Sequence, residues 1–307
     1  ERFPELRPAL QGLRSRLGKT EPGEPDTIYS RWLSALAVQW AEGVASPNGP
    51  LDEGLWRAKR LQTGLASWAT LRHATVLVNE RSAAQCGESG FEELLMRAPR
   101  GYVEPDPASF EAVAGLFEAV AGMIQASDAS QYQGTIKIED SGTEEPLRQG
   151  VLNRLKESAE QTRRFKAMAE KELRGEPLTD AEYEDILYLN RVAEHHFLVY
   201  KSLANPDLAL SNPDPMPKIA DAAGGGEYHA DFLMAAVGRP MEWDHIVPFF
   251  GRRQAVKGAV YSYYEFASKE LLDDKDWLKR LPGQAHPAWV APFISTDTLS
   301  CPPRDPF

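Results

Sequence analysis

The chain has 307 residues, and 34 Lys and Arg against 45 Asp and Glu give it a formal net charge of −11. With 42% apolar and 26% charged residues, the composition is that of a globular protein and excludes wholesale disorder or a fibrous repeat. The negative charge argues against nucleic acid as a main partner, and the longest uncharged apolar runs fall short of the ~18 residues that span a bilayer, so we predict no transmembrane segment.

Helices are predicted over the first two thirds of the chain. Apolar residues recur at helical spacing over 28–40, 55–78 and 107–124. The third of these helices begins with Asp106-Pro107, an N-cap followed by a proline at the first helical position. These patterns predict three amphipathic helices.

An irregular connection over 127–144, with a short strand, precedes two further predicted helices. The first covers 152–173 and ends at Gly175. The second runs from a capping box at 179–182 to about residue 204. Together they are expected to pack as a helical hairpin.

The C-terminal third is predicted to form strands. Residues 205–218 are rich in Pro, Asn and Asp and are typical of a linker. Stretches rich in β-formers follow at 228–237, 243–250 and 256–266, separated by tight turns. Three such strands suggest an antiparallel meander, before a short helix at 271–281.

The predicted fold class is therefore α+β, a predominantly helical array with a small C-terminal antiparallel β-meander. We predict two domains. The first is a helical domain over residues 1–205, and the second holds the linker, the β-meander and a Pro-rich tail over residues 206–307.

Cys86 and Cys301 are the only cysteines, which excludes a Cys-x-x-Cys metal site and a disulfide-rich scaffold. Both lie in loop-like sequence. One long-range disulfide and two unrelated thiols are both open interpretations.

Histidines and carboxylates on the predicted strands provide a candidate metal site. His229 and Asp231 are two apart on a strand and so point to the same face, where they could bind a metal or act as an acid–base pair. Asp244 and His245 face opposite ways, so only one of them could join His229. The alternative is a hydrogen-bonded strand face without a ligand.

A second polar group lies on a predicted helix, at Glu194-His195-His196. Adjacent helical residues point about 100° apart, so this group needs a distant partner to chelate an ion. The sequence contains no P-loop, dinucleotide fingerprint, Gly-x-Ser-x-Gly elbow or His-Glu-x-x-His motif.

Five stretches, in chain order, resemble segments of the bacterial family known as domain of unknown function 3160. The third contains Gly101-Tyr102-Val103-Glu104-Pro105, and the last contains Ser262-Tyr263-Tyr264-Glu265-Phe266. The five stretches are residues 26–33, 65–75, 101–105, 173–183 and 258–266.

The resemblance implies a large, mostly helical bacterial protein that is exported or lipid-anchored, at the periplasm, the outer surface or outside the cell, with no assigned activity. Relatives are usually longer, and this chain resembles their C-terminal portion. The resemblance therefore implies a partner, either the missing N-terminal portion or another protein chain.

One departure from the family pattern bears on function. Relatives often carry His-Thr-Asp just after an Ala-Asp pair, whereas Ala220-Asp221 is followed here by Ala222-Ala223 and three glycines. A site built on that run would be altered in this chain. Asp221 itself remains, close in sequence to His229 and Asp231.

Our leading hypothesis is a non-catalytic binding or assembly subunit of the cell envelope. The alternative is a metal-dependent hydrolase with a divalent transition metal held by His229 and Asp231, to which folding would add Asp221, His245 or the pair at 195–196. A third hypothesis places an enzyme site between this chain and its missing portion.

Overall fold

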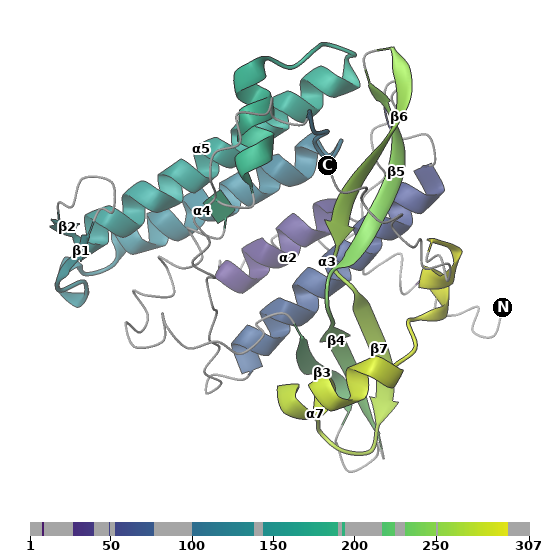
Figure 1. Cartoon of the computed structure of the whole chain (residues 1–307). Coiled ribbons are helices and arrows are strands. Elements are labelled where there is room, and N and C mark those ends of the chain that lie inside the picture. The colour runs from purple at the N-terminus through teal and green to yellow at the C-terminus, as the bar shows by residue number, and fades with distance from the viewer. Residues whose placement is uncertain are drawn as a thin grey trace, which may run out of the picture. The chain divides into compact units, whose positions relative to one another are not determined.

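The computed structural model describes residues 27–39, 53–76, 100–137, 144–189, 192–193, 217–224, 231–249 and 251–293, with the single positions 8 and 49. The chain divides into two compact units. The first comprises Glu1–Leu51, Leu77–Pro215 and Glu242–Gly258, and the second comprises Asp52–Val76, Met216–Met241 and Ala259–Phe307. Figure 1 shows the elements of both units.

The first unit is built mainly of helices, namely α2 (Ile28–Gln39), α4 (Pro107–Ala126), α5 (Leu147–Leu173) and a helix at 180–189. Helix α4 packs along α5, and α2 packs on α4 (Figure 1). These contacts bring together helices that are distant in the sequence.

Apolar stacking and charge pairing together fix α4 against α5. The rings of Phe110 and Phe165 stack with their centroids 6.2 Å apart. Beside them, Arg163 of α5 forms ion pairs with Glu111 and Glu118 of α4. The stack supplies buried area, and the arginine fork fixes the position along the helices.

The helix starts follow the capping residues seen in the sequence. The Asp106 carboxylate accepts a hydrogen bond from the backbone N–H of Ser109 at 3.2 Å and another from its hydroxyl at 2.6 Å. At the next cap, the N–H of Thr179 donates to Glu182 at 2.8 Å, and the N–H of Glu182 donates to the Thr179 hydroxyl at 3.3 Å. Both predicted starts are confirmed.

Two small sheets of two strands each accompany these helices. Strands β1 (Thr135–Lys137) and β2 (Glu144–Pro146) pair before α5. Strands β5 (Met241–Phe249) and β6 (Arg252–Val260) form a two-stranded ribbon that turns at Gly251, whose φ is +70°. Phe249 anchors this ribbon edge-on against Tyr183, with ring centroids 6.4 Å apart.

The second unit is a three-stranded antiparallel sheet with a helix on each face (Figure 1). The strand order is β3 (Lys218–Gly224), β4 (Phe232–Val237) and β7 (Tyr263–Ser268). Helix α3 (Glu53–Val76) covers one face, and α7 (Asp274–Arg280) covers the other.

Two apolar cores result because successive strand residues point to opposite faces of the sheet. The core under α3 is formed by Ala66, Ala69, Ala235, Val237 and Tyr263. The core under α7 is formed by Ile219, Met234, Ala236, Tyr264 and Trp277.

The α+β class, mainly helical with small antiparallel sheets towards the C-terminus, is confirmed. The strand pairing differs from the predicted meander. The stretch expected as one strand over 256–266 is divided between β6 and β7, and β4 pairs with β7 rather than with β5. Ser262 lies between β6 and β7, and its hydroxyl donates a hydrogen bond to the Arg239 carbonyl at 2.7 Å. This bond holds the start of β7 beside the turn that follows β4.

The predicted domain boundary between residues 205 and 206 lies outside the described residues, so it stays a prediction. The two compact units take segments from both sides of it. Helix α3 belongs with the C-terminal sheet, and most of the β5–β6 ribbon belongs with the N-terminal helices.

A methyl group added at Gly238 is expected to destabilise the second unit. A Cβ there would lie 2.7 Å from Ser262 Oγ, 2.8 Å from Tyr264 Cε2 and 2.9 Å from Leu281 Cδ1. Overpacking of this kind costs ~1–3 kcal/mol, so Gly238→Ala should lower the free energy of unfolding in urea by that amount. Gly258→Ala is the control, because nothing lies within 4 Å of its added Cβ. Equal stability of the two variants would contradict the close approach.

Candidate functional site

A buried carboxyl group lies where two of the family-like sequence segments meet. Glu172, in the last turn of α5, has only 9% of its surface exposed. The backbone N–H of Val103 donates to its carboxylate, at 3.1 Å from Oε2 and 3.4 Å from Oε1. This contact ties the segment at 101–105 to the end of α5.

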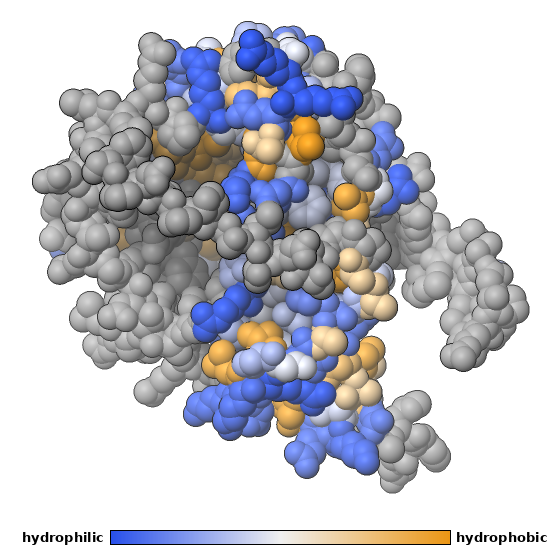
Figure 2. Space-filling model, turned by 45° about the vertical axis from the view of Figure 1, so that its right-hand side comes forward, coloured by the Kyte–Doolittle hydropathy of each residue, from blue (hydrophilic) through white to orange (hydrophobic). Residues whose placement is uncertain are grey.

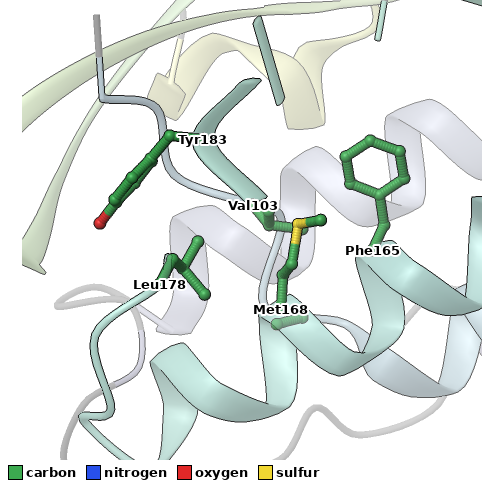
Figure 3. Close-up of a cluster of buried hydrophobic side chains, with 6 residues drawn as sticks. Val103, Phe165, Met168, Leu178 and Tyr183 are labelled. Carbon is green, nitrogen blue, oxygen red and sulfur yellow. The ribbon is translucent and has the colours of Figure 1, made fainter. Parts of the chain in front are cut away.

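Apolar side chains surround this contact. Figure 3 shows Val103 beside Met168, and Leu178 and Tyr183 on the segment that follows α5. The buried cluster consists of Val103, Phe165, Met168, Ala169, Leu178 and Tyr183. The chain approaches closely here, because a Cβ added at Gly101 would lie 2.5 Å from Ile186 Cγ2.

Burial governs the ionisation of Glu172. Loss of water raises its pKa to about 8, against the hydrogen bond from Val103, and the nearby charge of Glu182 adds to the increase. Burial, together with the charge of Glu172, also raises the pKa of Tyr102 well above its usual range. Burial therefore favours the protonated form of Glu172.

The neighbouring Glu182 behaves oppositely. Partial burial pushes its pKa upward, but hydrogen bonds from Lys171 and Thr179 outweigh this effect and lower the pKa below its usual value. Two carboxyl groups with separated pKa values are the arrangement that acid–base catalysts use. Here Glu182 is committed to a helix cap and Glu172 is almost enclosed, which favours a structural role for both.

The predicted metal ligands are only partly described. His229 lies outside the described residues, and of His245 only the backbone, in β5, is described. Asp221 lies in β3 opposite Met234, whereas Asp231 is exposed in the bend before β4. The two aspartates thus lie three ladder positions, ~10 Å, apart along the strand.

Asp221 is engaged by a cation. Arg72 of α3 donates from Nε to the Asp221 backbone carbonyl at 2.9 Å, and its Nη2 lies 3.4 Å from the carboxylate Oδ2. The positive charge disfavours a metal ion at this carboxylate. The ion pair also joins the sequence segment at 65–75 to the strand that carries Ala220-Asp221.

Among the residues that the structure describes, no three His, Cys, Asp or Glu side chains are grouped to hold a metal ion. Cys86, Cys301 and the group at 194–196 all lie outside the described residues. The metal site and the disulfide therefore stay predictions.

The segment at 262–266 holds the C-terminal part of the second unit to both faces of its sheet. Tyr264 packs edge-on against Trp277 at 5.1 Å and stacks on His286 at 4.5 Å, measured between ring centroids. On the opposite face, Glu265 accepts a hydrogen bond from Trp289 Nε1 at 3.4 Å. Because successive residues of β7 point to opposite faces of the sheet, this one strand contacts two different segments of the chain.

The protein is thus α+β, and three of its family-like segments, at 65–75, 101–105 and 258–266, contact parts of the chain that are distant in sequence. The family model described as "Protein of unknown function (DUF3160)" matches residues 2–290, and the chain belongs to this family. No curated protein and no solved structure matches it significantly.

Proposed function

We propose that this protein is an exported, non-catalytic binding or assembly subunit of the bacterial cell envelope. The observation that supports the proposal is the incompletely buried apolar surface of α4. In the part of the chain that the structure describes, α4 is the one helix long and apolar enough to cross a membrane, by length and composition only. Ala114 is nevertheless its only buried residue.

A helix this apolar is normally covered on most of its sides. Exposed apolar residues occur elsewhere too, and on the face shown in Figure 2 they lie in separate patches among hydrophilic residues, as is ordinary for a protein surface. The surface of α4 differs because its large apolar side chains are half-buried along the whole helix and not enclosed, and extended apolar surface of this kind is typical of a contact site.

The charges of α4 favour a protein partner over a lipid surface. Glu111 and Glu118 are its only charged residues, and both pair with Arg163. Helices that lie on membranes instead carry Lys and Arg on their polar face. The net charge of −11 further weakens attraction to anionic lipids.

Two glycines leave the backbone of α4 open to a close approach. Gly115 and Gly122 are seven residues apart and therefore lie on the same side of the helix. A Cβ added at either position would meet nothing within 4 Å. A partner helix could pack tightly on this side, whereas a long side chain there would block it.

We expect Gly115→Arg with Gly122→Arg to abolish partner binding without unfolding the chain. Each arginine has free space and raises helix propensity by about 0.5–1 kcal/mol, so the free energy of unfolding should hold or rise. The measurement is photo-crosslinking in cells of the source bacterium, with the reactive residue at the exposed Gln125. A defined product is expected in the envelope fraction for the wild type.

The matched control is the double variant Gly115→Ala with Gly122→Ala, which should keep the crosslinked product. A product that survives both arginines would show that α4 is not the docking surface. Absence of any product, or a chain confined to the cytosolic fraction, would overturn the proposal itself.

A further inference from the structure

Among the described strands, β6 forms an edge of the β5–β6 ribbon. Its only neighbour in the described sheets is β5, and no backbone hydrogen bond joins it to another described segment. Apart from Val256 and Val260, all its residues are exposed. A two-stranded ribbon is only marginally stable in water, and an open edge of this kind is a template for a further strand.

The charges on β6 indicate what such a strand would carry. Lys257 is already paired with Glu242 and Asp244 of β5. Arg252 and Arg253 are exposed and form no ion pair with any described residue. Because neighbouring strand residues point to opposite faces, one guanidinium stands on each face of the ribbon, beside the open edge.

We propose that the edge of β6 binds an extended acidic segment of a partner protein by strand addition. Backbone hydrogen bonds would supply affinity, and Arg252 and Arg253 would select carboxylates at the end of the added strand. This inference rests on the proposed binding function and names the chemistry of the partner. It uses a surface separate from α4.

A second copy of this chain is a poor occupant of the edge. Pairing two β6 strands would place three cationic side chains from each copy along one seam without adding a carboxylate, and like charges across strands are destabilising. An acidic segment instead supplies the missing charge.

The test uses the full chain and a nine-residue peptide of alternating Glu and Val, with a Lys-Val peptide of equal length as the control probe. We expect the Glu-Val peptide to bind and to protect β6 amides from hydrogen exchange. Arg252→Glu with Arg253→Glu should weaken binding about tenfold. Lys269→Glu with Lys275→Glu changes the net charge equally, at exposed lysines of the second unit that form no ion pair with a described residue, and should leave binding unchanged.

Proline substitutions test the backbone contribution. The N–H groups of Ala255 and Val256 point to opposite sides of β6, so one of the two faces the open edge. Proline at that position should abolish peptide binding while the ribbon stays folded. Proline at the other position should unfold the ribbon, which hydrogen exchange of β5 would report.

Equal binding of the Lys-Val peptide, or binding without protection of β6, would overturn the inference. A second outcome would also overturn it. If Arg252→Glu with Arg253→Glu abolished binding to vesicles with phosphatidylglycerol but left peptide binding unchanged, the two arginines would belong to a membrane contact. If the Glu-Val peptide does not bind while the α4 crosslink forms, only the inference about β6 is contradicted. If the peptide binds but the crosslink persists in the α4 arginine variant, the docking role of α4 is contradicted instead.

Discussion

Replacing Glu172 by glutamine is expected to stabilise the protein at alkaline pH and to leave its stability nearly unchanged at pH 4.5. In the folded chain burial raises the pKa of Glu172 to about 8, whereas its ordinary value is 4.5. The folded state keeps a proton that the unfolded state releases. The stability linked to this proton is therefore complete below pH 4.5 and is lost as the pH rises to about 8, at about 1.4 kcal/mol per pH unit.

Glutamine resembles the protonated carboxyl in shape and can still accept the hydrogen bond from Val103. Above pH 8, Glu172→Gln should exceed the wild type in free energy of unfolding by an amount on the order of 3–5 kcal/mol. Urea unfolding at pH 4.5 and pH 8.5 measures the difference.

Glu176→Gln is the control for this experiment. Glu176 is exposed in the same helical connection and pairs with Arg174. Its removal should change stability by less than about 0.5 kcal/mol at either pH. A difference between wild type and Glu172→Gln that does not change with pH would mean that folded Glu172 is ionised throughout.

The largest loss of stability is expected from Trp277→Ala in the second unit. Trp277 is fully buried, and its ring stacks on Phe266 at 5.7 Å and meets Tyr264 edge-on. Its Nε1 donates to the Val237 carbonyl at 2.8 Å. Removal of a buried tryptophan costs about 3–5 kcal/mol, and the stranded carbonyl adds to this loss.

Trp277→Phe separates the two contributions. Phenylalanine keeps much of the aromatic packing but leaves the Val237 carbonyl without its donor, so the expected loss is about 1–3 kcal/mol. Circular dichroism during urea unfolding reports both variants. A loss for the phenylalanine variant as large as that for alanine would assign the effect to the hydrogen bond, which both variants lack, rather than to the packing that phenylalanine keeps.

Helices were predictable from the sequence because their signals are local. The cap at Asp106 and the capping box at Thr179 specify hydrogen bonds within one helical turn, and the structure contains both. The strand pairing depends on residues far apart in the chain. The β-rich run at 256–266 gives no local sign that it divides at Ser262, and β3 has only one β-branched residue and an alanine, Ala222, that packs in the core under α3.

The buried carboxyl group of Glu172 was not predicted, although the sequence carries one signal of it. Phe165 and Met168 lie seven and four residues before it, so Glu172 continues the apolar stripe of α5. A charged residue on an apolar stripe is the available signal. Its pKa, however, depends on the Val103 segment that covers it, which no spacing within α5 discloses. The candidate ligands His229 and His245 stay predictions, because neither imidazole is described.

The ribbon of β5 and β6 leaves and rejoins the second unit at neighbouring points. Val237 and Tyr263 are direct partners in the ladder, and the N–H of Gly238 donates to the Ser262 carbonyl at 3.3 Å. Topologically, β4 and β7 are a hairpin whose loop has been replaced by another hairpin. Such an insert can be exchanged during evolution without moving a strand of the sheet that bears it. The edge of β6 can thus diversify among homologues while the β4–β7 pairing is retained.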